Sequence, residues 1–471
     1  MKKLFVGAVC LLLVAGAAAY WYFHRSGDAA RDVLPANAEA VAVLEPAELI
    51  EALGLPLDLV SKLPMGLEDF VEAIDLEKPV YAFVSDDDLS GASLNVKDAE
   101  KFVKAASGLG FGSEEQGGFR WLTNGSFMAC LDHDKLLLCG PVPESGQGAL
   151  RNKMIDMMRQ SRQDVALLDK ANRQTGSIRL CVSLGSLSKE QMPTGFDGSG
   201  AFLCSTLKVG KRDITLSANV EDKDGKPYSG RAEGEELLQP IDGLLPTVLP
   251  EKPFAWLCFG VKGENLLNVL RSGPQVSATL MMLNVLFFDA DLMLKAIDGD
   301  VIVMMPKADF DRKEILLTAR ISNSDFLKNA KDWDTTTSQG GMSLRKRGQE
   351  DDYVFTFNDE QAYFGVRGDF LYLTSSERLA NQVLQESEHG ILQPMVAGKH
   401  ICGSMDIAQI VEAYQAISLI LRTMPQLREA VDAFQHVSLS ANTPNSIELS
   451  IETNKPVKEV ISNLTKLTTG K

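Results

Sequence analysis

The chain lacks the short motifs that identify common catalytic sites. No Gly-x-Ser-x-Gly, His-Glu-x-x-His or phosphate-binding loop occurs in its 471 residues. The five histidines contain no pair at helical spacing and no metal-ligand spacing: His24, His133, His389, His400 and His436. No Cys-x-x-Cys occurs either, so zinc or thiol redox chemistry has no local support. We therefore predict no catalytic, cofactor-binding or metal-binding residue. An enzyme with dispersed active-site residues is kept as an alternative.

Basic residues are also in short supply. The formal net charge is −16, with 47 Lys and Arg against 63 Asp and Glu. An acidic surface repels nucleic acid and anionic membranes on average, so we predict no nucleic-acid partner. The one dense basic cluster is Arg345-Lys346-Arg347. Because Gly340, Gly341 and Gly348 bracket it, we expect a solvated loop there.

Three partial motifs have ordinary structural interpretations. Ser186-Leu187-Ser188-Lys189 has the Ser-x-x-Lys spacing but no Ser-Asp-Asn or Lys-Thr-Gly partner, which favours a simple helix start. Asp222-Lys223-Asp224-Gly225 resembles the opening of a calcium loop without the later ligands, which favours a hairpin turn. The glycines from Gly108 to Gly112 lack the strand-then-helix context of a dinucleotide loop, so we interpret residues 108–118 as a flexible connector.

The N-terminal segment predicts a membrane anchor. Lys2 and Lys3 precede an uncharged run from Leu4 to Phe23, about 20 residues and long enough to cross a bilayer core. The run ends in four aromatic residues, which is typical of a membrane interface. A signal peptide cleaved after Ala19 is the alternative. With the lysines inside, we expect a single-pass inner-membrane protein whose globular part lies in the periplasm or outside the cell.

Six further cysteines lie in apolar, strand-like runs: Cys130, Cys139, Cys181, Cys204, Cys258 and Cys402. This placement favours buried free thiols. For Cys130 and Cys139 there is a geometric reason as well. A two-residue His133-Asp134 turn pairs Cys130 with Leu137, so the two cysteines lie diagonally and out of disulfide reach.

Landmarks recur in the same order along the chain. The hairpin from Met128 to Cys139 is matched by the hairpin from Tyr363 to Thr374, and Leu34-Pro35 is matched by Leu249-Pro250. We interpret this as an ancient internal duplication. The predicted fold class is α+β: an N-terminal transmembrane helix, then two similar domains of mainly antiparallel sheet, each with helices packed on one face.

The expected boundaries follow from this repeat. Residues 1–32 form the anchor and a short linker, 33–238 the first copy and 244–471 the second, joined by a linker within Glu221 to Leu245. The segment from Val276 to Ile297 is apolar on nearly all sides, which predicts a buried helix between the copies or a groove for a lipid-like ligand or partner helix.

The opening of the first copy carries a family resemblance. Val33-Leu34-Pro35-Ala36-Asn37-Ala38, the strand from Val41 to Leu44 and Glu48-Leu49-Ile50 resemble bacterial membrane- or lipid-anchored envelope proteins of domain-of-unknown-function families. The resemblance implies anchoring but no activity, cofactor or catalytic residue. The chain departs from the lipid-anchored members, because Cys10 lies within the apolar run and follows Val9.

These observations together predict a membrane-tethered extracytoplasmic protein with a non-catalytic binding or scaffold role in the cell envelope. Its predicted partners are the bilayer, through Leu4 to Phe23, and an envelope protein or a hydrophobic ligand. A carrier of a lipid or peptide is the alternative.

Overall fold

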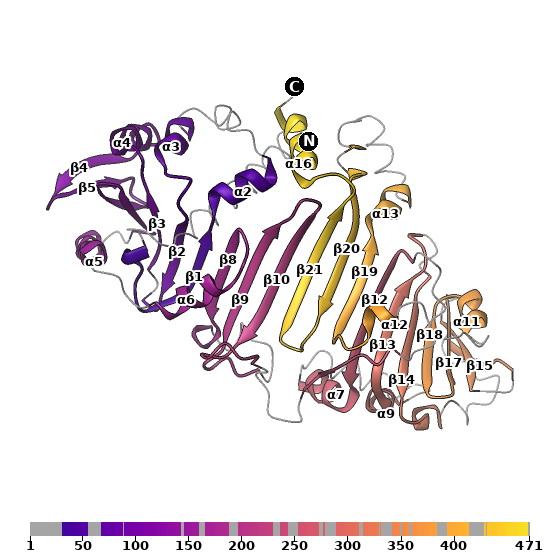
Figure 1. The fold of residues 1–471 in the computed structure, drawn as a ribbon. Coiled ribbons are helices and arrows are strands. Elements are labelled where there is room, and N and C mark those ends of the chain that lie inside the picture. The colour runs from indigo at the N-terminus through magenta and orange to yellow at the C-terminus, as the bar shows by residue number, and fades with distance from the viewer. Residues whose placement is uncertain are drawn as a thin grey trace.

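The computed structural model describes residues 31–54, 67–87, 89–142, 146–159, 165–187, 196–228, 236–243, 253–272, 277, 289–309, 314–328, 330, 342–348, 351–357, 360–383, 393–413, 428–429 and 431–469. The strands of these residues form one 21-stranded antiparallel sheet (Figure 1).

Ten strands form the first half of the sheet, in the chain order β1 Ala38–Leu44, β2 Val80–Ser85, β3 Ser90–Asn95, β4 Gly112–Gln116, β5 Phe119–Thr123, β6 Met128–Asp132, β7 Lys135–Gly140, β8 Ile178–Ser183, β9 Phe202–Val209 and β10 Asp213–Glu221. The remaining strands are β11 Leu238–Gln239, β12 Ala255–Lys262, β13 Ile297–Met305, β14 Leu316–Ile321, β15 Met342–Lys346, β16 Asp352–Phe357, β17 Glu360–Arg367, β18 Phe370–Thr374, β19 Ile401–Asp406, β20 Phe434–Ala441 and β21 Ser446–Thr453.

The order of pairing is the same in both halves. From the left edge of Figure 1 the strands run β4-β5-β6-β7-β3-β2-β1-β8-β9-β10. From the right edge they run β15-β16-β17-β18-β14-β13-β12-β19-β20-β21. The halves meet where β10 pairs with β21, from Asp213 opposite Glu452 to Asn219 opposite Ser446. The strand order therefore reads the same from either end.

The predicted fold class is wrong in its arrangement of layers. It placed two separate sheets in two domains, whereas the β10–β21 pairing makes one continuous sheet. Sequence patterns inside each half cannot reveal a pairing between strands more than two hundred residues apart. The domain bounds 33–238 and 244–471 stay a prediction. The expected linker contains β11, which pairs with β12 at Val261 and Gly260.

Helices cover both faces of the sheet at its outer strands, whereas the sequence predicted helices on one face only. In the first half α3 Leu67–Ala73 and α4 Ala99–Gly108 pack on one face, while α5 Gln147–Arg159 and α6 Ala166–Arg173 pack on the other. In the second half α9 Ala290–Ala296 and η4 Asp325–Leu327 lie opposite α11 Glu377–Val383 and α12 Gln393–Val396. These helices enclose four hydrophobic cores, two on each side of the sheet, and Leu267 and Ala290 belong to a smaller fifth core of the described residues.

The outer strands show why both faces need cover. Along β7, Leu137 and Cys139 enter one core and their neighbours Leu136 and Leu138 enter the other. Successive side chains of a strand point to opposite faces, so an unbroken apolar run buries both. The matched turns are also alike, because His133 and Gly368 each have positive φ, 53° and 55°. Two-residue hairpins favour this conformation.

Further elements lie at the upper rim of the sheet in Figure 1: α2 Pro46–Leu53, α13 Ile407–Ala413 and α16 Val457–Thr469. The helix α7 Gly263–Ser272 follows β12, and the short turns η1 Arg31–Val33 and η3 Leu184–Ser186 complete the described helical segments. No described helix is long and apolar enough to cross a membrane. The expected span Leu4 to Phe23 lies outside the described residues.

Three local predictions also fail. A continuous helix from Val276 to Ile297 is wrong, because Asp289 is extended and caps α9 by accepting the Leu292 N–H at 2.9 Å; residues 278–288 lie outside the described residues. Arg345 and Lys346 lie on β15, not on a loop. Part of the expected connector 108–118 is the strand β4, paired with β5 across the Gly117-Gly118 turn.

Candidate functional site

Six central strands, β8, β9, β10, β21, β20 and β19, carry one apolar and one polar face. Directly paired residues of neighbouring strands lie on the same face of a sheet. One row across β9, β10, β21 and β20 consists of Leu207, Leu216, Leu449 and Leu439. The next row consists of Val209, Ile214, Ile451 and Val437. We call the surface made by these two rows and their neighbours the apolar face.

The neighbours extend this face without a charged side chain. On β8 the partners are Ile178, Leu180 and Val182, and on β19 they are Ile401, Gly403 and Met405. Ala218 of β10 lies opposite Ile447 of β21. A mainly aliphatic surface six strands wide, with Ser205 of β9 between Leu180 and Ala218, therefore crosses the line where the two halves join.

The centre of the apolar face is accessible. Leu216 is 46% exposed and Ile447 is 43% exposed, although both lie in the middle of the sheet. Among the described helices, the main contacts with the central strands come from α2 on β9 and α13 on β20, at the rim, and from α6 on β8. Aliphatic residues in the middle of a sheet are normally buried, so these two exposed side chains among half-buried neighbours indicate a surface that binds something.

A groove marks the margin of the apolar face in the second half. Its volume is about 290 Å³. It is lined by residues of β12, β13, β19 and β20: Ala255, Trp256, Leu257, Val303, Met304, Met305, Gly403, Ser404, Met405, Val437 and Leu439. Trp256 and Ser404 also line a second, more polar pocket of about 420 Å³ at the strand ends, where Asp406, Asp432 and His436 lie. The groove itself has no charged side chain.

The opposite face of the central strands is polar. Thr215 of β10 lies beside Ser450 of β21, with their hydroxyl oxygens 3.4 Å apart. Ser217 donates to the Glu448 carboxylate at 3.3 Å. Such side chains are compatible with water, and this face needs no cover. The contrast between the faces follows from strict alternation along each strand.

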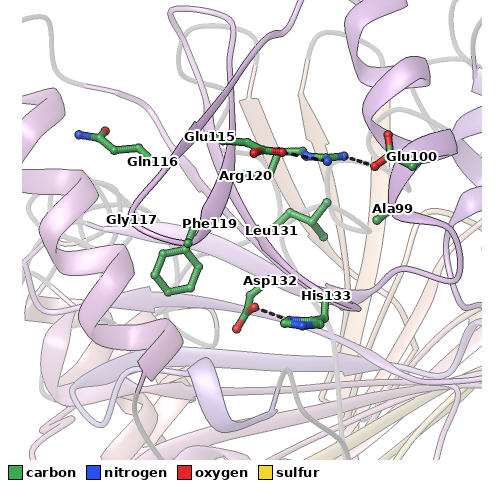
Figure 2. Close-up of a pocket in the computed structure, with 11 residues that line it drawn as sticks. Ala99, Glu100, Glu115, Gln116, Gly117, Phe119, Arg120, Leu131, Asp132 and His133 are labelled. Carbon is green, nitrogen blue, oxygen red and sulfur yellow. Dashed lines mark hydrogen bonds and ion pairs between the residues drawn. The ribbon is translucent and has the colours of Figure 1, made fainter.

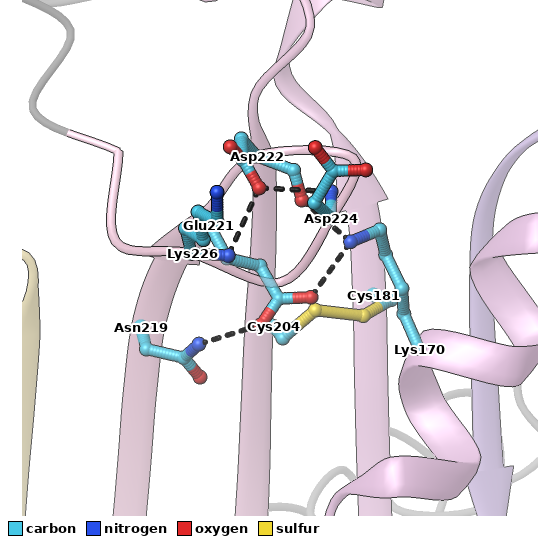
Figure 3. Close-up of polar contacts among 8 residues, drawn as sticks. All are labelled: Lys170, Cys181, Cys204, Asn219, Glu221, Asp222, Asp224 and Lys226. Atoms are coloured by element: carbon cyan, nitrogen blue, oxygen red, sulfur yellow. Dashed lines mark hydrogen bonds and ion pairs between the residues drawn. A yellow bond between two sulfur atoms is a disulfide. The ribbon is translucent and has the colours of Figure 1, made fainter.

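Covalent and ionic contacts hold the first-half strands that carry the apolar face (Figure 3). Cys181 of β8 and Cys204 of β9 are directly paired and form a disulfide, so the prediction of free thiols is wrong for these two. The buried Lys170 of α6 donates to the Glu221 carboxylate at 2.8 Å and to the Asp222 carbonyl at 2.6 Å. The Lys170 ammonium also lies 4.7 Å from the centre of the Phe202 ring.

The turn after β10 confirms the hairpin interpretation of Asp222-Lys223-Asp224-Gly225. The Asp222 carboxylate accepts the backbone N–H groups of Asp224 and Lys226, at 2.8 and 2.9 Å. The hydrogen bond from Lys226 lowers the pKa of Asp222. Because these carboxylate oxygens serve the turn itself, the segment has a structural explanation that requires no cation.

A polar pocket of about 410 Å³ lies beside the β4–β5 hairpin (Figure 2). Arg120 donates to Glu100 at 2.8 Å and to Glu115 at 3.1 Å, and His133 Nδ1 lies 2.7 Å from Asp132. A His–Asp pair can support a nucleophile, but none of the lining residues is Ser, Thr, Cys or Lys. The pocket therefore offers no hydroxyl, thiol or amine nucleophile to this His–Asp pair.

The remaining sequence candidates do not converge. Ser186 ends η3 and donates to the Ser183 carbonyl, while Ser188 and Lys189 lie outside the described residues. His133 lies on a turn, His400 precedes β19, and His436 lies on β20. Among the residues that the structure describes, no group of three or more His, Cys, Asp or Glu is placed to hold a metal ion.

Four cysteines are buried free thiols, as predicted for them: Cys130, Cys139, Cys258 and Cys402. The predicted register is confirmed, with Cys130 opposite Leu137 and Cys139 opposite Met128. Burial raises the pKa of Cys130 to about 12. Cys258 and Cys402 are directly paired on β12 and β19, and burial raises the pKa of both. All four are therefore protonated and weakly nucleophilic at neutral pH.

Sequence reasoning missed the apolar face, although its signal is present. The strands Asp213–Glu221 and Ser446–Thr453 alternate polar and apolar residues along their length. That alternation predicts one solvated and one covered face. The pairing of β10 with β21 was needed to show that the apolar sides of both halves lie on the same surface.

Comparisons with known proteins leave the family open. No protein-family model matches the chain, and no curated protein sequence matches it. Crystal form I of TP0453 is 12% identical over 41% of this chain and 79% of that chain, with a TM-score of 0.29. The DNA polymerase sliding clamp from Pseudomonas aeruginosa is 9% identical over 88% of this chain and 99% of that chain, with a TM-score of 0.12. At these TM-scores neither similarity carries an argument about function.

Proposed function

We propose that the chain is a non-catalytic binding protein of the cell envelope, tethered to the membrane through Leu4 to Phe23, which binds a hydrophobic partner on its apolar face. The observation that carries the proposal is the accessible aliphatic surface around Leu216 and Ile447. Covering such a surface is worth about 25 cal/mol per Å² of apolar area removed from water. The binding surface is thus a large sheet face and not an enclosed active site.

The disulfide supports the proposed compartment. Disulfides form and persist in extracellular and periplasmic spaces and are rare in the cytosol of mesophiles. The Cys181–Cys204 bridge fits the orientation predicted from Lys2 and Lys3, with the globular part on the far side of the inner membrane. A net charge of −16 disfavours nucleic acid as the partner.

A second candidate function, carrier of a lipid-like ligand, is favoured by the groove beside Met405. Its lining is mainly apolar, and at about 290 Å³ it lies at the small end of ligand pockets. Native mass spectrometry of the full chain, released from detergent micelles, tests this candidate. A co-purifying lipid that is lost in a Leu257→Glu variant supports the carrier. Protein without bound lipid in wild type counts against it.

Methionine oxidation tests whether the apolar face is covered in the membrane. Met405 lies on the face, while Met395 on α12 is 52% exposed and provides an internal control. We expect peroxide to oxidise Met405 slowly in native membranes and faster after purification into nanodiscs that hold one copy. Met395 should react at the same rate in both. Equal Met405 rates in the two preparations would contradict the proposed function.

A further inference from the structure

We infer that the partner of the apolar face is a second copy of the same chain, packed face to face as in a two-sheet sandwich. This inference rests on the proposed function, because it names the partner of the same surface. Two antiparallel sheets with apolar inner faces pack about 10 Å apart with interdigitating side chains. The symmetry, area and chemistry of the face each point to this partner.

The rows of the apolar face read the same from either end. Across β9, β10, β21 and β20 one row is Leu-Leu-Leu-Leu and the next is Val-Ile-Ile-Val. When a second copy packs face to face on this surface, its leucine row can therefore lie against the leucine row of the first copy. Its row of β-branched residues then lies against the matching row. A two-fold dimer requires a self-complementary patch of this kind. The pairing of β10 with β21 places the centre of the patch at the line between the halves.

The size of the face matches a stable dimer. Strands lie about 4.8 Å apart and rise about 3.4 Å per residue, so six strands of about seven residues span roughly 700 Å². Two such faces together remove roughly 1,400 Å² from water, close to the standard interface of about 1,600 Å². The groove beside Met405 covers only part of this surface, so a ligand seated there would leave the leucine row around Leu216 and Leu449 in water.

The chemistry of the face also suits a second copy of the chain. No charged side chain lies in the two central rows, so two copies meet without burying an unpaired charge. Tethering two copies in one membrane raises their effective concentration, which favours the association.

Co-purification of two differently tagged full-length chains tests the inference. Both are expressed in one cell and extracted in mild detergent, and membranes that express each tag separately are mixed as the control for association after extraction. We expect the tags to co-purify only when they are co-expressed. Leu216→Glu on the apolar face should reduce recovery at least about tenfold, because it buries a carboxylate at the centre of the interface. Ser438→Glu, on the polar face between Ser404 of β19 and Ser450 of β21, should leave recovery unchanged.

Each outcome supports or overturns the inference. Wild-type chains that do not co-purify overturn it, and so does unchanged recovery of Leu216→Glu. If Leu216→Glu does not fold, as judged by its melting curve, Leu449→Asn replaces it with the same expectation. Protected Met405 without co-purification means that the face has another partner, so the proposed function stands and the inference fails. Unprotected Met405 contradicts the proposed function itself.

Discussion

Removing the Lys170 side chain should strongly destabilise the first half of the sheet. Lys170 is 4% exposed and Glu221 is 7% exposed, and they share a 2.8 Å salt bridge. Lys170→Met leaves the Glu221 carboxylate buried, with Asn219 Nδ2 donating to it at 3.2 Å. Breaking one partner of a buried pair costs about 3 to 5 kcal/mol. The Asp222 carbonyl loses its lysine donor at the same time.

Urea unfolding followed by circular dichroism measures this cost. We expect the free energy of unfolding to fall by about 3 kcal/mol or more in Lys170→Met. The double variant Lys170→Met with Glu221→Leu should recover most of the loss, because an apolar pair of similar volume is often as stable as a buried ion pair. A loss below about 1 kcal/mol in the single variant would refute the reasoning, since that is the value of an exposed pair.

Three further predictions concern cysteines and pH. Cys181→Ser should lower the free energy of unfolding by about 3 kcal/mol, because the disulfide closes a loop between residues 23 positions apart. Dithiothreitol should destabilise wild type but not this variant, and equal sensitivity of the two proteins would contradict the prediction. Burial raises the pKa of Cys130 to about 12, so peptide mapping should find no iodoacetamide label on Cys130 at pH 8 until urea unfolds the chain. A hydrogen bond from Arg378 lowers the pKa of Glu314 below its ordinary 4.5, which stabilises the folded state above that pH. Arg378→Gln should therefore lower the free energy of unfolding by less than about 1 kcal/mol at pH 7. The melting curves of the variant and of wild type should converge as the pH falls through the lowered pKa of Glu314.

Short-range patterns predicted the Cys130–Cys139 hairpin, although three other local predictions failed. The His133-Asp134 turn and the positions of Cys130 and Cys139 follow from hairpin geometry, and the structure has the predicted register. The alternation of apolar and polar residues within each strand is likewise local. These features depend on the turn and strand preferences of a few neighbouring residues, which can be read from the sequence.

Longer-range features could not be predicted in the same way. The unbroken apolar run of β7 could be assigned to a strand, but only packing shows that Leu137 and Leu138 enter different cores. The Cys181–Cys204 disulfide depends on the pairing of β8 with β9. Cys258 and Cys402 also lie directly opposite each other on neighbouring strands, yet they are free thiols. The apolar face depends on the junction of β10 with β21, whose partners are too distant in the chain for any sequence period to link them.

A photo-crosslinking scan along β10 tests the central claim, that the apolar face is the binding surface. p-Benzoylphenylalanine is placed singly at each position from Ile214 to Asn219 in the full chain and irradiated in native membranes. Side chains of a strand alternate between faces, so we predict adducts at Ile214, Leu216 and Ala218 and none at Thr215, Ser217 and Asn219. Adduct yields that do not alternate along β10 would contradict the claim that the apolar face is the binding surface.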